Sequence, residues 1–334
     1  MEKVGIVTLF ESDNFGTCLQ AYALQQTIME FGYTTKVVNH RHHSLSGVKT
    51  PVGNKALKIF REQGLLRLIE VIAQKKYSKE KTVVFRSFRN SYLCVTDEEY
   101  RTFEEMYPLN EVFDAFVCGS DMIWAQESNR DLDIYLLQFV DPNKRIAYAP
   151  SFGRPDLPSD EIKRYQDGIG NFQFLSCREA SGVDIIRDLV GREAELVVDP
   201  TLLLTAKQWD SMFASLKPDE DYILCYVFGG LPKSFKKNLA YLKSKLGCKV
   251  RYIPGKLSEF VHERSAGAYG PAEYVRLYAN AKFIIANSYH GLIFSLIFNK
   301  PFILLHRDER EYWSRYEDRM QSILHILGLE ERYR

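Results

Sequence analysis

The segment AKFIIANSYHGLIFSLIFNKPFILL, residues 281–305, places four residues of mostly polar character, NSYH (287–290), between two apolar runs. Its first part, KFIIA (282–286), predicts a strand, HGLIFSLIF (290–298) predicts a helix, and PFILL (301–305) predicts a second strand. The polar residues therefore fall where a strand ends and a helix begins. In open α/β sheets, this is the place where ligands bind.

Three residues of this segment are candidates for a binding or catalytic site. The first turn of a helix offers unpaired N–H groups and a partial positive charge, so Ser288 and Gly291 stand where a phosphate would bind. Gly291 would also let a ligand approach the backbone closely. His290 is the candidate acid/base, since an imidazole titrates near neutral pH. The alternative is structural: Ser288 caps the helix, Tyr289 packs, and His290 is a hydrogen-bonded turn residue.

The composition is that of an ordinary globular protein. The chain has 334 residues, which suggests roughly two domains, and 46% of them are hydrophobic and 26% charged. A formal net charge of +1 gives no electrostatic reason to expect nucleic acid as a partner. The longest apolar run, GLIFSLIF (291–298), is far shorter than the ~20 residues that cross a bilayer. The six cysteines form no C-x-x-C pair, which favours free thiols in a reducing, cytoplasmic compartment.

Short apolar runs alternate with helical patterns along the whole chain. VGIVTLF (4–10), LQAYALQQTIMEFG (19–32) and TTKVVNH (34–40) predict a strand–helix–strand unit. Later runs such as FDAFVCGS (113–120) and AELVVDP (194–200) continue the alternation. Uniformly apolar strands separated by helices are typical of a parallel sheet that is covered on both faces.

The polar segment SLKPDEDY, residues 215–222, is the best candidate for a linker. It separates two alternating α/β halves, so we expect doubly wound domains over residues 1–215 and 220–334, with a cleft between them. A final helix, DRMQSILHILGL (318–329), is placed to pack back on the first domain.

A basic helical insertion is predicted at about residues 55–92 of the first domain. Lysine and arginine outnumber glutamate there, and leucine, isoleucine and phenylalanine form an apolar side. Two interpretations stay open: a solvated face over a buried stripe, or a basic amphipathic helix that contacts an anionic membrane. HRHH (40–43) has no accompanying set of carboxylates, so we expect no metal site.

Seven blocks of the sequence follow one another in a fixed order. They are GIVTLFESDNFGTCLQAYALQQTIMEFGY (5–33), FDAFVCGSDMIWA (113–125), KRIAYAPSFG (144–153), SCREASGVDII (176–186), VVDPTLLLTAKQW (197–209), FIIANSYHGLIFSLIFNKPFI (283–303) and RMQSILHILGLEER (319–332). Together they span nearly the whole chain, from residue 5 to residue 332, and such an ordered series is far more specific than a single motif. This series resembles the polysaccharide pyruvyl transferase family.

The resemblance implies a fold of two Rossmann-like domains, as in glycosyltransferases of the two-domain type (GT-B-like). It implies that a pyruvyl group passes from phosphoenolpyruvate to two hydroxyls of a sugar, which forms a cyclic ketal and releases phosphate. The acceptor would be a cell-surface polysaccharide or its precursor, free or lipid-linked. The enzyme would be cytoplasmic, with peripheral contact at the inner membrane face as an option. Phosphoenolpyruvate would be a donor substrate, and no cofactor is expected.

The donor carries a phosphate and a carboxylate, and the planar fork of arginine suits both groups. The resemblance places a donor-binding arginine at Arg178, directly after the strand QFLSC (173–177). Arg307 and Arg310 follow the last strand, and either of them is a candidate for another donor contact. For each arginine the alternative is an ion pair or a solvated charge.

Two loops at the ends of strands supply the remaining candidates for the substrate site. These are Asn14, Gly16, Gly119, Ser120, Asp121 and Trp124. Each has a structural alternative: Asn14, Ser120 or Asp121 would cap a helix, and Trp124 would pack in the core instead of stacking on a sugar.

Two other functions stay open. A nucleotide-sugar-dependent glycosyltransferase would use a similar two-domain frame, although the chain has neither a G-x-x-x-x-G-K-[ST] nor a G-x-G-x-x-G motif. A non-catalytic carbohydrate-binding protein would keep the fold alone. The sequence predicts neither the acceptor sugar nor the oligomeric state.

Overall fold

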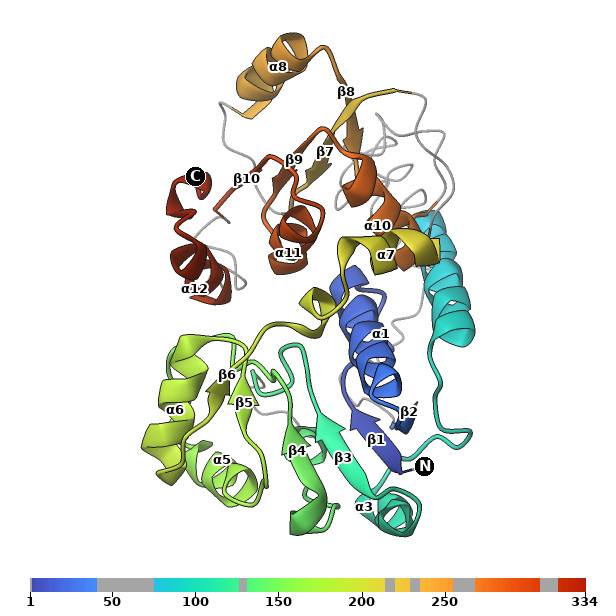
Figure 1. Ribbon diagram of the computed structural model, residues 1–334, viewed down its shortest axis with the longest axis vertical. Coiled ribbons are helices and arrows are strands. Elements are labelled where there is room, and N and C mark those ends of the chain that lie inside the picture. The colour runs from blue at the N-terminus through green and yellow to red at the C-terminus, as the bar shows by residue number, and fades with distance from the viewer. Residues whose placement is uncertain are drawn as a thin grey trace, which may run out of the picture.

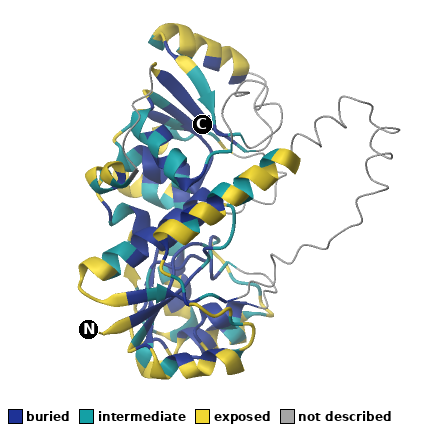
Figure 2. Ribbon diagram, turned by 90° about the vertical axis from the view of Figure 1, so that its right-hand side faces the viewer, coloured by how far each residue is buried: buried dark blue, intermediate teal, exposed yellow. Residues whose placement is uncertain are grey.

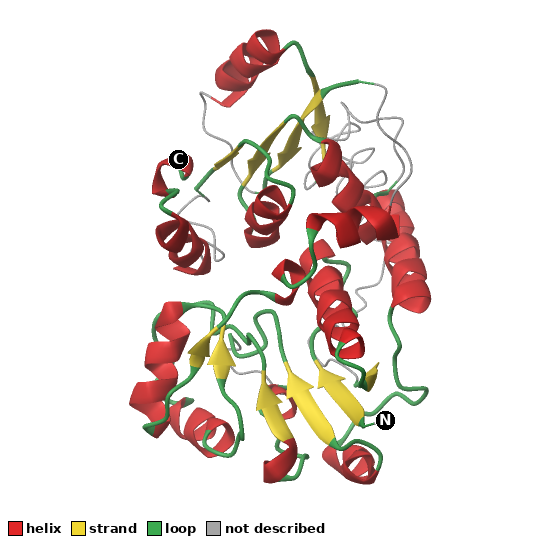
Figure 3. Cartoon of the chain, in the orientation of Figure 1, coloured by secondary structure: helices red, strands yellow, loops and turns green. Residues whose placement is uncertain are grey.

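The computed structural model describes residues 2–40, 75–125, 131–213, 220–228, 235–254, 268–306 and 318–334. In this part of the chain, the protein consists of two α/β halves, each built on a four-stranded parallel sheet (Figure 1). Helices cover the sheets, as Figure 3 shows.

The first half is built on a sheet with the strand order β2-β1-β3-β4. Its strands are β1 (Lys3–Val7), β2 (Thr34–Val37), β3 (Ala115–Cys118) and β4 (Arg145–Ala147). A parallel pair, β5 (Ser176–Cys177) and β6 (Glu195–Leu196), lies next to β4, which a bridge between Ile146 and Phe174 connects to this region. The helices described in this half are α1 (Phe15–Glu30), α3 (Phe103–Met106), α4 (Leu132–Tyr135), α5 (Ile162–Ile169) and α6 (Ala180–Val190).

The second half repeats this arrangement with the strand order β10-β9-β7-β8. Its strands are β7 (Tyr222–Tyr226), β8 (Lys249–Tyr252), β9 (Phe283–Ala286) and β10 (Phe302–Leu304). The helices described in it are α8 (Phe235–Leu246), α10 (Pro271–Asn280), α11 (Tyr289–Ile297) and α12 (Asp318–Leu327). Helix α7 (Ala206–Phe213) comes before β7 in the sequence but packs on α10.

Each sheet has its first strand in an inner position. β1 lies between β2 and β3, and β7 lies between β8 and β9, all of them parallel. The connections that leave such a first strand and the strand beside it run to opposite sides, and α/β proteins bind ligands at this point of the carboxyl edge. The predicted α/β fold with two doubly wound sheets is confirmed.

The two halves share one apolar core. Phe15 of α1 stacks on Tyr274 of α10, with ring centroids 4.6 Å apart. Trp209 of α7 lies 5.2 Å from the ring of Phe294 in α11 and 5.9 Å from that of Tyr22 in α1. All five side chains are buried, and Figure 2 shows buried residues in both halves and along the region where they meet.

The described end of the basic insertion is a helix over residues 75–92. Phe85 lies 5.0 Å from the ring of Phe15 and Phe88 lies 6.1 Å from that of Tyr22, whereas most other residues of this helix are exposed. This part therefore has a solvated face over a buried stripe. Residues 55–74 lie outside the described residues, so membrane contact by the insertion stays a prediction.

We expect Trp209→Ala to lower the free energy of unfolding by about 3–5 kcal/mol, because it removes a large side chain from the core that both halves share. Since this core joins the halves, the variant should still unfold in a single calorimetric transition at a lower temperature. Tyr241→Ala, at an exposed position of α8, is the control and should change the stability little. Two separate transitions in the Trp209 variant would argue against a shared core.

Candidate active site

Arg178 follows β5 directly and is almost completely buried, with 3% of its surface exposed. Its Nη1 donates a hydrogen bond to Oδ2 of Asp199 at 2.6 Å. Its Nη2 lies 3.7 Å from Oδ1 of Asp121, and its Nε lies 3.9 Å from Oε2 of Glu179. Asp199 comes after β6, the parallel partner of β5, and Asp121 comes after β3. The carboxyl edge of the first half thus gathers one guanidinium and three carboxyl groups.

His290, in the first turn of α11, reaches the same carboxylate from the second half. Its Nε2 lies 3.6 Å from Oδ2 of Asp199. The imidazole also rests against Gly16, where an added Cβ would overlap with the ring atoms. Gly16 stands in the first turn of α1, which Asn14 caps by accepting hydrogen bonds from the N–H groups of Gly16 and Thr17 at 3.0 and 3.4 Å. A side chain at position 16 would therefore displace the imidazole.

The buried ring of Tyr289 has two guanidinium groups beside it. The Cζ of Arg178 lies 4.3 Å from the ring centroid, and the Cζ of Arg319 lies 5.0 Å from it. Arg319 comes from α12, which packs on α11. Burial and the positive charge of Arg178 lower the pKa of Arg319 to about 10. Within the part of the chain that the structure describes, Arg319 forms no ion pair.

These side chains form one group, which we call the Asp199 cluster. Its members are Asp121, Arg178, Glu179, Asp199, Tyr289, His290 and Arg319. Six of its buried polar atoms have no hydrogen-bond partner among the described residues: Nε and Nη2 of Arg178, Oε2 of Glu179, the Tyr289 hydroxyl, Nε2 of His290 and Nε of Arg319.

Orphaned polar atoms at such density point to a binding site. Roughly 90% or more of buried polar groups in proteins find a partner. Of the six atoms in the Asp199 cluster, all but the Glu179 oxygen are able to donate a hydrogen bond. Donors with two arginines among them suit an anionic ligand that carries several oxygen atoms. The arrangement therefore indicates a site for a small anion.

The charges of the cluster oppose the effect of burial on the two aspartates. Burial raises the pKa of Asp199, but contact with His290 and the charge of Arg178 outweigh it, so this pKa lies below its ordinary value. For Asp121, burial likewise raises the pKa, and Arg178 and His290 bring it below the usual range. At Glu179 burial dominates and holds the pKa above its usual value. Asp199 is thus ionised at neutral pH.

Ser288 and Gly291, which we expected to bind the donor, serve the fold of α11. The hydroxyl of Ser288 accepts a hydrogen bond from the N–H of Gly291 at 3.0 Å and caps the helix. An added Cβ at Gly291 would lie 2.6 Å from Oγ of Ser288 and 2.9 Å from the hydroxyl of Tyr278. Protein atoms therefore fill the space that we expected a ligand to use.

Three candidates after β3 belong to the interior of the first half, which corrects their predicted place in the substrate site. Trp124 is fully buried and packs on Phe152, with ring centroids 5.2 Å apart, so it is not free to stack on a sugar. The Ser120 hydroxyl donates to the carbonyl of Ala149 at 2.7 Å. Gly119 has a φ of +127°, a conformation that favours glycine, so the path of the backbone explains this residue.

The structure brings several predicted residues together from distant parts of the sequence. Those that meet at the Asp199 carboxylate or beside it are Gly16, Asp121, Arg178 and His290. Asn14 is an exposed helix cap next to them. Arg307 and Arg310 lie outside the described residues, so their donor contacts stay predictions.

Sequence reasoning missed Asp199, Tyr289 and Arg319 as site residues. Asp199 had a usable signal, because it ends the apolar run AELVVDP (194–200) just as Arg178 ends its own strand. Arg319 had none, since only the packing of α12 on α11 brings it to the ring of Tyr289. The contact of Arg319 with Tyr289 depends on the tertiary structure and has no local sequence pattern.

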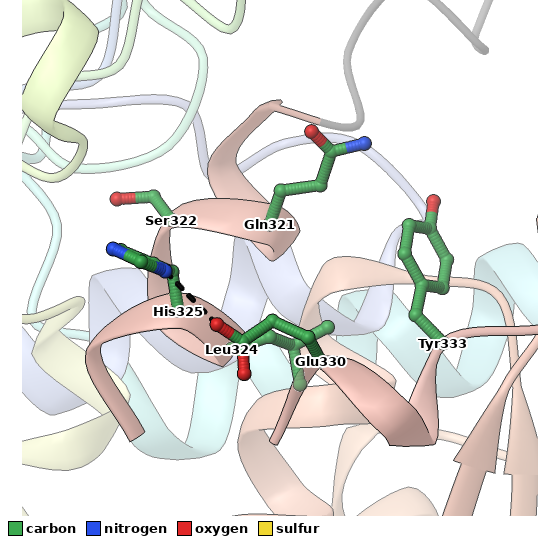
Figure 4. A pocket seen from close by; sticks show the side chains of 6 residues that line it. All are labelled: Gln321, Ser322, Leu324, His325, Glu330 and Tyr333. Carbon is green, nitrogen blue, oxygen red and sulfur yellow. Dashed lines mark hydrogen bonds and ion pairs between the residues drawn. The ribbon is translucent and has the colours of Figure 1, made fainter. Parts of the chain in front are cut away.

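A separate cavity of about 480 Å³ lies at α12 and the segment that follows it (Figure 4). It is lined by Gln321, Ser322, Leu324, His325, Glu330 and Tyr333. In it, Nδ1 of His325 lies 2.9 Å from Oε1 of Glu330. None of the lining residues belongs to the Asp199 cluster, so this cavity is distinct from the candidate active site.

Two further properties are those of the described residues alone. Among them, no group of three or more histidine, cysteine, aspartate or glutamate side chains is arranged to hold a metal ion. The helices in the same residues include none that combines the length and the apolar character needed to span a membrane.

The geometry defines an α/β protein of two doubly wound halves with a charged centre where side chains from both halves meet. A model of the polysaccharide pyruvyl transferase family matches residues 14–309, a range that includes every member of the Asp199 cluster except Arg319. The chain therefore belongs to the polysaccharide pyruvyl transferase family, and its class is that of a transferase. No curated protein sequence matches it.

Solved structures with a similar course of the chain include two UDP-GlcNAc 2-epimerases. The one from Neisseria meningitidis, bound to UDP-GlcNAc, is 10% identical with a TM-score of 0.45, over 99% of this chain and 92% of that chain. The one from Methanocaldococcus jannaschii, in complex with UDP-GlcNAc and UDP, is 13% identical with a TM-score of 0.46, over 98% and 93%. E. coli heptosyltransferase WaaC with ADP-2-deoxy-2-fluoro heptose is 11% identical with a TM-score of 0.40, over 98% and 99%. Identities and TM-scores this low say nothing about the substrate of this chain.

We expect Asp199→Asn to lower the free energy of unfolding at pH 7 by about 3–5 kcal/mol, because Arg178 stays buried without its closest counter-charge. The folded-state pKa of Asp199 is lowered, so its stabilisation is complete above the unfolded value of about 3.9 and is lost as the pH falls below it. Urea unfolding at pH 7 and pH 3 should show a smaller difference between variant and wild type at pH 3.

The control for this experiment is Asp97→Asn, which removes an exposed partner of Lys36. It should change the stability little at either pH, because exposed ion pairs contribute little. A difference of equal size at pH 7 and pH 3 for the Asp199 variant would show that its effect is not electrostatic.

Proposed function

We propose that this chain transfers a pyruvyl group from phosphoenolpyruvate to two hydroxyls of a sugar in a cell-surface polysaccharide or its precursor. The product is a cyclic ketal, phosphate is released, and no cofactor takes part. Family membership supports the proposal. The observation that carries it is the convergence of Arg178 from one half and His290 from the other on the carboxylate of Asp199.

The donor site is the group of free donors around Tyr289. Phosphoenolpyruvate carries a phosphate and a carboxylate, so it needs several donors with positive charge. Among the described residues, two buried nitrogen atoms of Arg178, Nε and Nη2, and Nε of Arg319 have no hydrogen-bond acceptor. The mutual repulsion of the two guanidinium groups contributes to the lowered pKa of Arg319. An anion between them would relieve this repulsion, which favours binding of the donor.

The reaction requires a balanced pair of proton movements. One sugar hydroxyl adds to C2 of the donor, and C3 takes up a proton and becomes a methyl group. The bond between C2 and the phosphate oxygen then breaks, and the second hydroxyl adds to C2. In sum, one hydroxyl proton ends on the methyl group and the other on the phosphate.

His290 is the residue that we assign to proton transfer, because an imidazole both gives and takes protons near neutral pH. Its Nε2 faces the carboxylate of Asp199 at 3.6 Å. Gly16 leaves room for the ring and limits where it lies. A positioned acid/base of this kind contributes ~10²–10⁴-fold to a rate.

We expect His290→Gln to reduce phosphate release from phosphoenolpyruvate by at least about 100-fold, because glutamine cannot carry the proton. Phosphate is followed by phosphorus NMR with a panel of methyl glycosides as acceptors, and the ketal methyl group by proton NMR. His325→Gln changes an exposed histidine of α12 and should leave the rate unchanged. Near-normal turnover in the His290 variant would remove this residue from the proton transfer.

Binding of the donor is tested by thermal stabilisation, which needs no acceptor. We expect phosphoenolpyruvate to raise the unfolding temperature of the wild type. Arg319→Gln should weaken its binding by at least about tenfold, because a charge-assisted hydrogen bond is lost. Arg332→Gln is the matched control in the same C-terminal segment. Stabilisation by a nucleotide sugar and not by phosphoenolpyruvate would overturn the proposed function in favour of a glycosyltransferase.

A further inference from the structure

A second cavity lies beside the candidate active site, between the β1–α1 loop, the end of β2 and the helix of residues 75–92. We call it the 75–92 cavity. Its volume is about 760 Å³, within the range of ~300–1,000 Å³ that small-molecule sites occupy. Phe10 and Leu93 give its lining an apolar part, and Asn39, Arg86 and Asn90 give it a polar part.

The polar side chains of the 75–92 cavity divide into fixed and free groups. Asp13 is fixed, since it accepts a hydrogen bond from Thr82 at 2.5 Å and lies 3.5 Å from Nη1 of Arg89. In the described part of the chain, the guanidinium of Arg86 and the side-chain amides of Asn39 and Asn90 have no hydrogen bond or ion pair.

The lining favours a sugar over a strongly charged ligand. Glu11 and Asp13 supply two negative charges, and Arg86 and Arg89 supply two positive charges, so the described residues of the lining have no net charge. Amides and hydroxyls both donate and accept hydrogen bonds, as the hydroxyls of a sugar do. The apolar part of the lining is available for the C–H faces of a sugar ring.

The position of the cavity suits an acceptor for the chemistry at His290. Asp13 lines the cavity, and Gly16, three residues further on, supports the imidazole of His290. Three residues span at most ~11 Å of chain. Both places lie at the carboxyl edge of β1, the edge at which α/β sheets bind ligands. A sugar in the cavity therefore lies at the same sheet edge as Gly16, which supports the imidazole of His290.

We propose that the 75–92 cavity is the acceptor site and binds a neutral sugar unit of the glycan through Arg86, Asn90 and Asn39. The inference rests on the proposed function, because only that function gives the bound sugar the role of acceptor. It assigns to the helix of residues 75–92 the recognition of the sugar, apart from the donor chemistry at the Asp199 cluster.

The test is saturation-transfer NMR of the full chain with methyl glycosides of glucose, galactose, mannose and N-acetylglucosamine. We expect at least one glycoside to receive saturation, and the double variant Arg86→Gln with Asn90→Ala to reduce that signal at least fivefold. Both residues are exposed, so the variant should fold as the wild type does. The matched control is Arg187→Gln with Asn238→Ala, which changes exposed helical residues of α6 and α8 and should leave the signal unchanged.

Thermal stabilisation by phosphoenolpyruvate, measured on the same samples, separates the two proposals. It should be the same in the double variant and the wild type. If no glycoside receives saturation, or if the signal survives in the double variant, the acceptor site is overturned. If glycosides bind as expected but phosphoenolpyruvate does not stabilise the wild type, the proposed function fails and the sugar-binding cavity stands.

Discussion

The carboxylate of Asp199 is the point on which the arrangement of this protein depends. Its Oδ2 lies 2.6 Å from Nη1 of Arg178 in the first half and 3.6 Å from Nε2 of His290 in the second. Removing such groups from water is expensive, and apolar packing often stabilises a fold as well or better. Within the part of the chain that the structure describes, this buried set also leaves six polar atoms without hydrogen-bond partners, so ligand binding explains it better than stability does.

The first turn of α1 links the two binding regions that we propose. Gly16 touches the imidazole of His290, and Asp13, just before this turn, lines the 75–92 cavity. Both proposed binding regions thus adjoin one loop, whose geometry Asn14 fixes by capping the helix. Asn14 itself is exposed, but by capping α1 it helps to hold Gly16 against the imidazole of His290.

The fold could be predicted from the sequence to a large extent, because apolar strands alternate with helical patterns throughout. Among the candidate site residues, His290 was singled out by its place between a strand and a helix, and Arg178 by the family resemblance together with its place after a strand. The site was not predictable where packing decides. The side chain of Trp124 turns inward onto Phe152, whereas Arg319 joins the site only because α12 packs on α11. Neither outcome is encoded in local spacing.

The shared core has a consequence for protein engineering. Aromatic residues of α1 and α7 pack on α10 and α11, as the stacking of Phe15 on Tyr274 shows. A chimaera that takes one half from this chain and the other from a relative cannot simply be joined at the linker. The chimaera would have to keep aromatic side chains that match on both sides of the shared core, because a close-packed apolar interface does not tolerate mismatched shapes. A graft of the helix of residues 75–92, which lines the proposed acceptor site, would likewise have to keep Phe85 and Phe88, because they pack on Phe15 and Tyr22 of α1.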